Sequence, residues 1–333
     1  MDVMSSKLIK FIKACLKIVK RVLPKYSSKF SRKDFSLWQH VVMLCLRIKT
    51  KQKYREFCEL LVLSPLIQDM LGIKKVPHFT TLNKIFLKLK NIVFSTLLTL
   101  TAGEFKDCSI DSTGFDRRHD SKHYVKRAKI LIRSLKTTFL IDVRSLKIID
   151  VHMTTTRKHD SKIILDLVKK HKIKSLRADK GYDDRIVRNF LRKHGIRPLI
   201  KHREFSSLDR IYNERLDRKE YGRRAMSETV NSIIKRKYGD YVSSKKWWNQ
   251  FKEMKLMCLV HNIERNILFF ILFFIEGFYR AENNDLKVIY KQGLFCWFSI
   301  HLNVIELRKD WAWLLYTILI SYIPGLKYSP SLP

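Results

Sequence analysis

Apolar residues in the first hundred positions recur at the spacing of an α-helix. Residues 8–18 form an amphipathic pattern, with lysines on one face and a second face that carries Leu8, Phe11, Ile12, Cys15 and Ile18. Residues 35–51 and 53–71 have the same period, with helix breaks expected at Pro65 and near Gly72. The pattern therefore predicts a series of helices joined by short turns.

A further amphipathic stretch begins at Thr80 or Thr81, and either hydroxyl is expected to cap its helix. Residues 1–103 are thus predicted to form a helical N-terminal region. Several short helices in a basic chain suit a helix-turn-helix that reads DNA, and they suit a plain helical bundle equally well. The first residues lack a continuous apolar run and a cleavage site of small residues, so they do not resemble a signal peptide.

The pattern changes at about residue 104, where short β-branched and aromatic runs alternate with stretches of helical period. Strands are predicted within residues 105–115, 133–145, 146–156, 175–184 and 196–203, and helices within residues 160–172, 184–195 and 223–239. Three antiparallel strands followed by a βαβα run are the layout of an RNase H-like α/β fold. Residues 104–265 are therefore expected to form a domain of this fold.

The last part of the chain, residues 266–333, is an apolar extension to which the pattern assigns no role. Ile267–Ile275 and Trp311–Ile323 are strongly apolar, yet neither reaches the roughly 18 to 20 residues that span a bilayer as a helix. From about Asp285 onward the density of Lys and Arg falls, and we interpret this stretch as read-through into neighbouring sequence. No membrane partner is expected.

Charge narrows the class of partner. The chain has 67 Lys and Arg against 31 Asp and Glu, a formal net charge of +36. An excess of this size favours a polyanion, because each phosphate that a cation neutralises releases counterions, and nucleic acid is preferred over a membrane surface. The 6 cysteines include no CxxC pair, which argues against a zinc ribbon or a disulfide framework and favours a reducing, cytoplasmic compartment.

Three acidic residues fall where the predicted fold brings chain segments together. Asp111 is expected at the end of the first strand, Asp179 at the end of the fourth, and Glu228 near the start of the last helix. The first and fourth strands are neighbours in an RNase H-like sheet, so their carboxyl ends meet. Converging carboxylates are hard oxygen ligands that suit two Mg²⁺ or Mn²⁺ ions acting on a phosphodiester.

Each acid has a simpler reading when taken alone. Asp111 can stabilise the turn of Asp-Ser-Thr-Gly, and Asp179 precedes Lys180-Gly181, which is also a turn signature. Glu228 can form an i,i+4 surface pair with Arg224. Taken together, three acids on the expected strands and helix favour the catalytic reading.

Three motifs carry a resemblance to a known family: Ile-Asp-Ser-Thr-Gly-Phe at 110–115, Ala-Asp-Lys-Gly-Tyr-Asp-Asp at 178–184, and a Tyr-x2-Arg-x3-Glu-x6-Lys signature. The signature is met at all four positions, by Tyr221, Arg224, Glu228 and Lys235. Over about residues 35–265 the chain resembles the DDE transposases of prokaryotic insertion sequences.

This resemblance implies that Asp111, Asp179 and Glu228 hold two Mg²⁺ or Mn²⁺ ions and are the catalytic residues. It also implies that Tyr221, Arg224 and Lys235 position DNA near the cut. The enzyme would cleave the ends of a mobile element and join the 3′-hydroxyl ends to target DNA. It would act as a homodimer or larger assembly on double-stranded DNA, in the cytoplasm of a prokaryote and associated with the nucleoid.

Other candidates have weaker patterns. Arg117 and Arg118 begin a basic loop that is expected to contact DNA rather than to bind a metal through His119, Asp120 and His123, and Lys180 is a further expected DNA contact. The acids Asp160, Asp183 and Asp184 are expected to cap helices. The run Lys245, Lys246, Trp247 and Trp248 suits contacts with unpaired DNA, although such a Trp pair is more often packed in a core, as expected here.

Two alternatives to a transposase stay open. The first is a metal-dependent nuclease of the same fold that cleaves without joining. The second is a DNA-binding relic that has lost catalysis, against which the complete set of three acids and the full Tyr-Arg-Glu-Lys signature count.

Overall fold

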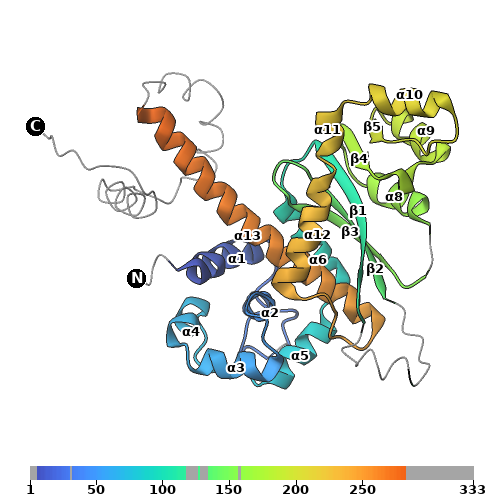
Figure 1. Cartoon of the computed structure of the whole chain (residues 1–333). Coiled ribbons are helices and arrows are strands. Elements are labelled where there is room, and N and C mark those ends of the chain that lie inside the picture. Colours follow the sequence, from blue (N-terminus) through green and yellow to red (C-terminus); the bar gives the residue numbers. More distant parts are fainter. Residues whose placement is uncertain (1–5, 31, 118–126, 128–133, 157–158, 283–333) are drawn as a thin grey trace, which may run out of the picture. The chain divides into compact units, whose positions relative to one another are not determined.

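The computed structural model describes residues 6–30, 32–117, 127, 134–156 and 159–282. Residues Met1–Ile271 form one compact unit and Leu272–Pro333 a second, of which only the end of a helix up to Glu282 is described. Figure 1 shows the first unit as a group of helices together with a sheet that is covered by further helices. The predicted division at 103/104 and 265/266 stays a prediction.

The N-terminal part is helical, as the spacing predicts. Its helices are α1 (Lys7–Val22), α2 (Leu37–Lys49), α3 (Tyr54–Val62), α4 (Pro65–Leu71), α5 (Phe79–Lys88) and α6 (Asn91–Ala102). Ser36 and Gln39 form a capping box at the start of α2. Pro65 is the first residue of α4, and Gly72 ends that helix with a φ of 61°, a conformation that glycine adopts without strain.

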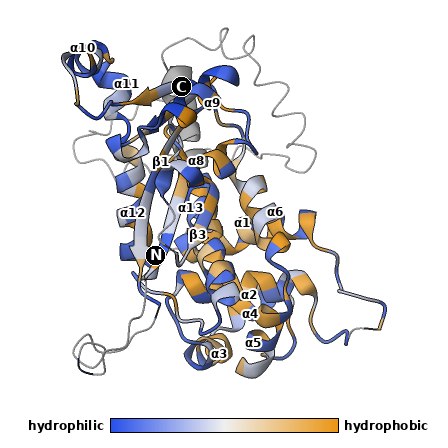
Figure 2. Cartoon of the chain, turned by 90° about the vertical axis from the view of Figure 1, so that its right-hand side faces the viewer, coloured by the Kyte–Doolittle hydropathy of each residue, from blue (hydrophilic) through white to orange (hydrophobic). Residues whose placement is uncertain are grey.

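Two details of this region differ from the prediction. The N-cap of α5 is His78, so neither Thr80 nor Thr81 caps it. On α1 the buried residues are Ile9, Phe11, Ile12, Cys15 and Val19, whereas Leu8 and Ile18 are only partly buried at the edge of the apolar face. In Figure 2 the hydrophobic residues are dense in α2 and α6, which contribute to one large core cluster.

The sheet has five strands in the order β3-β2-β1-β4-β5. The strands are β1 (Asp107–Phe115), β2 (Leu135–Asp142), β3 (Ile148–Thr154), β4 (Ser175–Ala178) and β5 (Arg197–Ile200). The first three pair antiparallel, and β4 and β5 pair parallel to β1 and to each other. The five strands of this mixed sheet and the pairing of the first with the fourth agree with the sequence prediction.

Helices cover both faces of the sheet, because its strands alternate apolar side chains between two cores. On one face Cys108, Ile110 and Leu140 pack with α8 (Asp160–Val168) and α9 (Arg185–Lys193). On the other face Phe115 and Phe139 pack with α12 (Ala225–Tyr238), α13 (Trp247–Glu282) and the N-terminal helices.

Helix caps on the α8 and α9 side correct two assignments. The N-cap of α8 is His159, whose side chain accepts a hydrogen bond from the Ser161 amide, and Asp160 is the first residue of the helix. Asp184 caps α9 as predicted, but Asp183 does not. The Asp183 carboxylate instead accepts hydrogen bonds from Arg188 Nε at 2.7 Å and from the Arg203 amide at 2.9 Å.

Two helices between β5 and α12 were missed: α10 (Ser207–Arg215) and α11 (Arg218–Gly222). They are largely hydrophilic, as Figure 2 shows for α10, so apolar periodicity could not reveal them. The available signal was Ser206 followed three residues later by Asp209, which form a capping box.

The apolar run Ile267–Ile275 lies within α13, and Trp311–Ile323 lies outside the described residues. Within the described part of the chain, no single helix is long and apolar enough to cross a membrane. The pair α5 and α6 meets the test of length and composition jointly, with a bend of 85° between them.

Candidate active site

Strand β1 carries the first of the three acids, but not where the sequence predicts. Asp111 lies in the middle of β1 rather than at its end, because β1 continues to Phe115 and pairs with β2 along that whole length. Odd-numbered residues of β1 face α12, and even-numbered residues face α8 and α9. Asp111 is therefore on the α12 side, half-buried.

Asp179 is brought beside Asp111 by the parallel pairing of β1 and β4. The register joins Asp107 to Ser175 and Ser109 to Arg177, and Ala178 is the last residue of β4. Continued two residues beyond the last paired residues, that register would bring Asp179 opposite Asp111, and Asp179 is close enough for its charge to raise the pKa of Asp111. Asp179 follows β4 directly, as predicted, and is exposed.

Glu228 comes from the first turn of α12, which lies along β1. Asn231, one helical turn further, donates from Nδ2 to Asp111 Oδ2 at 2.9 Å. Glu228 Oε1 pairs with an Arg224 guanidinium nitrogen at 2.8 Å, and the Glu228 side chain is 55% exposed. The surface pair suggested by the i,i+4 spacing is thus present, on the helix that also contacts Asp111.

The three carboxylates influence one another electrostatically. Burial raises the pKa of Asp111, and the negative charges of Glu228 and Asp179 raise it further. The Ser112 amide and the Arg224 guanidinium act in the opposite direction without reversing the shift. Among the residues that the structure describes, no group of three or more His, Cys, Asp or Glu side chains is assembled closely enough to hold a metal ion.

The opposite side of β1 carries a second polar cluster, one residue along. Ser112 Oγ lies 2.7 Å from Thr138 Oγ1 and 2.8 Å from the Tyr182 hydroxyl, and it donates to Asp160 Oδ1 at 3.1 Å. The same Asp160 oxygen pairs with Lys136 Nζ at 2.6 Å. Donors and acceptors are matched in this cluster.

Comparison with known proteins identifies this part of the chain. Residues 104–263 match the family model described as the transposase DDE domain. They form a transposase DDE domain. The match covers β1 to β5, α8 to α12 and the first half of α13, so all three acids lie within the DDE domain.

Other comparisons add little. A piggyBac transposase synaptic complex with hairpin DNA, solved by cryo-EM, aligns with 97% of this chain and 85% of that chain. The sequence identity is 9% and the TM-score is 0.45, a similarity too low to carry an argument. No relative was found among the curated proteins.

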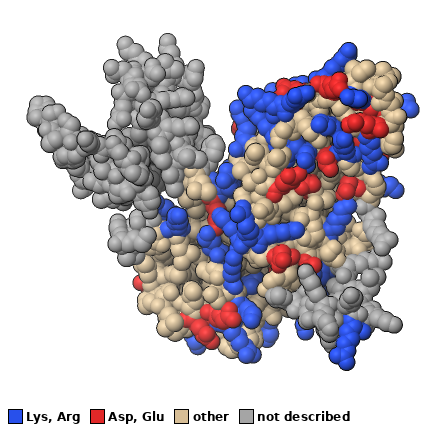
Figure 3. All heavy atoms as spheres, in the orientation of Figure 1, with Lys and Arg blue, Asp and Glu red and all other residues tan. Residues whose placement is uncertain are grey.

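The predicted DNA contacts of the DDE domain occupy different elements. Tyr221 is on α11, Arg224 is the N-cap of α12, and Lys235 lies on α12 with its ammonium 5.4 Å from the centre of the Phe115 ring. Lys180, after β4, pairs with Glu204 at 3.1 Å. Figure 3 shows Lys and Arg gathered over α11 and around α12.

The remaining two predicted contacts begin the basic loop after β1. Arg117 donates from Nε to Gln250 Oε1 at 3.0 Å, which ties it to α13. Arg118, together with the His119, Asp120 and His123 considered as metal ligands, lies outside the described residues.

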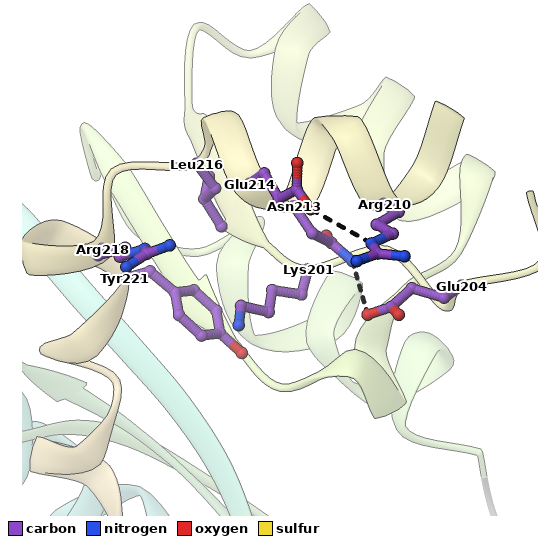
Figure 4. A pocket seen from close by; sticks show the side chains of 8 residues that line it. All are labelled: Lys201, Glu204, Arg210, Asn213, Glu214, Leu216, Arg218 and Tyr221. Atoms are coloured by element: carbon purple, nitrogen blue, oxygen red, sulfur yellow. Dashed lines mark hydrogen bonds and ion pairs between the residues drawn. The ribbon is translucent and has the colours of Figure 1, made fainter. Parts of the chain in front are cut away.

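A pocket of about 420 Å³ adjoins Tyr221 in the DDE domain. It is lined by Lys201, Glu204, Arg210, Asn213, Glu214, Leu216, Arg218 and Tyr221, and by none of the three acids. Figure 4 shows Tyr221 and Lys201 extending into the same space, and the Lys201 ammonium lies 5.1 Å from the centre of the Tyr221 ring. The pocket therefore borders the candidate site without containing it.

Helix α12 of the DDE domain is fixed to β1 at both ends. At its start, Ser109 Oγ donates to Ser227 Oγ at 3.1 Å. After its end, the Asp116 amide donates to the Asp240 carbonyl at 2.9 Å, and the Val242 amide donates to the Asp116 carbonyl at 2.8 Å. The sequence did not single out Ser109 or Asn231, although Asn231 follows Glu228 by three positions and so shares its helix face.

Proposed function

We propose that this protein is a DNA transposase in which Asp111, Asp179 and Glu228 are the catalytic residues. It would cleave a phosphodiester bond at each end of a mobile element and expose a 3′-hydroxyl. That hydroxyl would then attack a target phosphodiester in line, so that one phosphorus–oxygen bond forms as another breaks. We also propose that the five-stranded sheet belongs to the RNase H-like fold.

The observation that supports these roles best is the convergence of three acids from distant parts of a DDE domain. The β1–β4 register makes Asp111 level with Asp179, and α12 brings Glu228 to the same side of β1 through the Asn231–Asp111 hydrogen bond. Like charges brought together in a partly buried place are unfavourable without a cation. Burial raises the pKa of Asp111, and the charges of Glu228 and Asp179 add to that rise.

A divalent cation fits this donor set in chemistry, since all three acids offer the hard oxygens that Mg²⁺ and Mn²⁺ prefer. We propose Asp111 and Asp179 as its fixed ligands and Glu228 as a ligand that turns in from its Arg224 pair. A bound pair of such ions would activate the attacking oxygen and stabilise the leaving oxygen.

The remaining residues have supporting tasks in this proposal. Asn231 holds the orientation of Asp111 through its hydrogen bond to Oδ2. Arg224 holds Glu228 close through their ion pair, and it becomes free to contact phosphate once Glu228 turns away. Tyr221, Lys180, Lys235, Arg117 and Arg118 are proposed to hold double-stranded DNA along this side of the domain. A homodimer or larger assembly would bring two element ends together.

The test is cleavage and joining of DNA that carries the source element's own ends, with Mg²⁺ or Mn²⁺. The wild type is compared with Asp111→Asn, Asp179→Asn and Glu228→Gln, and DNA binding is measured in parallel. Loss of both reactions in all three variants, with binding retained, is the expected result. Cleavage that persists in any one of them would remove that residue from the catalytic set.

The same assay separates the two alternatives. A nuclease without strand transfer would cleave the ends but produce no joined product. A DNA-binding relic would bind the ends and do neither.

A further inference from the structure

Two tryptophans at the start of α13 are exposed, contrary to the expectation that they pack in a core. Trp247 is 42% and Trp248 is 59% exposed. Their ring centroids are 3.9 Å apart with planes at 32°, so the rings stack on one another. Phe251 supports both of them edge-on, with ring centroids 4.7 Å from Trp247 and 6.2 Å from Trp248. The result is an aromatic surface open to solvent.

The chain around this aromatic pair is firmly held. Glu253, which is 3% exposed, accepts from the Ser243 amide at 3.0 Å and from the Ser244 amide at 2.9 Å. Gln250, 1% exposed, donates to the Ser244 carbonyl at 2.9 Å and accepts from Arg117. These hydrogen bonds fix the segment that bears the rings, so less conformational entropy is lost when a ligand binds there.

The charges beside the rings have one sign. Residues 241–252 include three lysines, at 245, 246 and 252, and no Asp or Glu. Lys245 and Lys246 are exposed and directly precede the rings, whereas Lys252 is buried and donates to the Leu87 carbonyl at 2.8 Å. Two exposed ammonium groups next to a stacked aromatic surface combine phosphate and base recognition.

We propose that Trp247 and Trp248 form a stacking platform for an unpaired base of DNA, with Lys245 and Lys246 binding the adjoining phosphates. The proposal deepens the proposed function and rests on it for the identity of the nucleic acid. An aromatic face stacks on any base, so the platform recognises the unpaired state rather than a sequence. Charge complementarity favours this ligand over an apolar protein surface, for which two exposed lysines would be a cost.

The platform is linked to the strand that bears Asp111. Asp116, at the far end of β1, is bridged to Tyr241, and Arg117 is bonded to Gln250 at the base of the rings. Asp111 and Asp116 are about 16 Å apart along the strand at about 3.3 Å per residue. That length corresponds to about five duplex base pairs at about 3.4 Å each. The segment that bears the rings is thus attached to the end of the strand that carries Asp111, which supports contact of both with one DNA molecule.

The experiment measures binding of the full chain to short fluorescein-labelled oligonucleotides in EDTA, so that it does not depend on catalysis. The probes are a fully paired duplex, the same duplex with a single-stranded tail, and the single strand alone. Trp248→Ala is compared with wild type, with Trp248→Phe, and with Phe205→Ala, which removes another exposed ring, 87% exposed, in the loop before α10. Thermal melting establishes that each variant is folded.

Trp248→Ala is expected to weaken binding to the tailed and single-stranded probes by about tenfold, and binding to the duplex by less than about twofold. Trp248→Phe should keep most of the affinity, and Phe205→Ala should match wild type. An equal loss on all three probes, or no loss on any, would overturn the proposal. Unchanged DNA binding with weaker self-association of Trp248→Ala would instead make the rings a protein interface.

These results are independent of the catalytic assignment. If Asp111→Asn keeps its cleavage activity but Trp248→Ala loses affinity for unpaired DNA, the catalytic role proposed for Asp111 fails and the platform stands. If instead Asp111→Asn loses cleavage and Trp248→Ala keeps its affinity for unpaired DNA, the platform is wrong and the catalytic assignment stands.

Discussion

Two polar clusters lie on opposite sides of β1, one residue apart, and they differ in how their charges are balanced. The Ser112 cluster joins hydroxyls to Asp160 and pairs that carboxylate with Lys136. The Asp111 cluster brings one carboxylate toward two others, with Asn231 as its hydrogen-bond donor. The first cluster is complete by itself, and the second is not.

This difference separates a structural role from a functional one. Polar groups that satisfy one another hold a sheet and its covering helices together. Carboxylates that repel one another reduce stability, and a fold retains them where an external cation or substrate completes the set. The comparison therefore predicts that changes in the Ser112 cluster act on stability, and that changes in the Asp111 cluster act on activity.

The largest expected effect is that of Asp111→Asn. Cleavage should fall by on the order of 10³-fold or more, which is at least about 4 kcal/mol in the activation free energy. The free energy of unfolding should stay equal or rise, because a partly buried charge is removed. Activity and urea unfolding are measured on the same preparation.

Asp142→Asn is the matched control for that change, on the neighbouring strand. The Asp142 carboxylate accepts from the Ser145 amide at 2.7 Å and from the Ser145 hydroxyl at 2.6 Å. This variant should lose stability and keep its activity per folded molecule. If Asp111→Asn and Asp142→Asn change activity and the free energy of unfolding in the same way, the proposed difference between the two kinds of site is wrong.

The rule that uncompensated buried groups cost stability can be tested away from the site, at His261. Its Nε2 donates to the Leu146 carbonyl at 2.8 Å, and in the described part of the chain its Nδ1 has no hydrogen-bond partner. Burial lowers its pKa from 6.5 to about 4. Protonation therefore favours the unfolded state, so this contribution is absent above pH 6.5 and grows as the pH falls toward 4.

The expected loss from His261 protonation is about 3 kcal/mol of unfolding free energy between these pH values. It is read as the difference between wild type and His261→Gln, which stays neutral and can donate the same bond. If the free energy of unfolding depends on pH in the same way for the two proteins, the prediction is wrong.

A smaller effect on activity is expected for Asn231→Ala. Loss of the donor to Asp111 should reduce activity and the apparent affinity for Mg²⁺ by about 10- to 100-fold. Thr229→Ala, an exposed position on the same helix, serves as the control and should leave both values unchanged. A Mg²⁺ titration of cleavage distinguishes weaker metal binding from a general loss of fold.

The smallest effect is expected for Tyr182→Phe in the Ser112 cluster. Removing this hydroxyl, which lies 2.8 Å from Ser112 Oγ, should lower the free energy of unfolding by about 1 kcal/mol with activity retained. A double-mutant cycle with Ser112→Ala measures the coupling between the two groups. Loss of cleavage in a stable Tyr182→Phe protein would assign this cluster to the active site instead.

Much of the fold follows from local pattern, because its strands and most of its helices carry clear periodicity. The exceptions are informative. Ser112, Thr113 and Gly114 look like a turn, yet they continue β1 because β2, more than twenty residues later, pairs with them. Helix α10 has only a short apolar stripe, Leu208, Ile211 and Tyr212, and its capping box was its clearer local sign.

The candidate site is predictable in its residues and not in its geometry. The motifs select Asp111, Asp179 and Glu228, and the strand order explains why the first two meet. The i,i+4 spacing does indicate the pair of Glu228 with Arg224, but nothing in the local sequence reveals that Asn231 reaches Asp111, since that contact depends on how α12 lies on β1.

The attachment of α12 to β1 at both ends has a consequence for synthesis of the chain. Asp111 and Asp179 leave the ribosome early, but α12 is secured only when Val242 pairs with Asp116. At about 5–20 residues per second, the chain between Asp111 and Val242 takes roughly 7 to 26 s to make. During that interval the unfinished chain lacks the secured helix that bears Glu228, so the three acids can come together only after most of the DDE domain has been made.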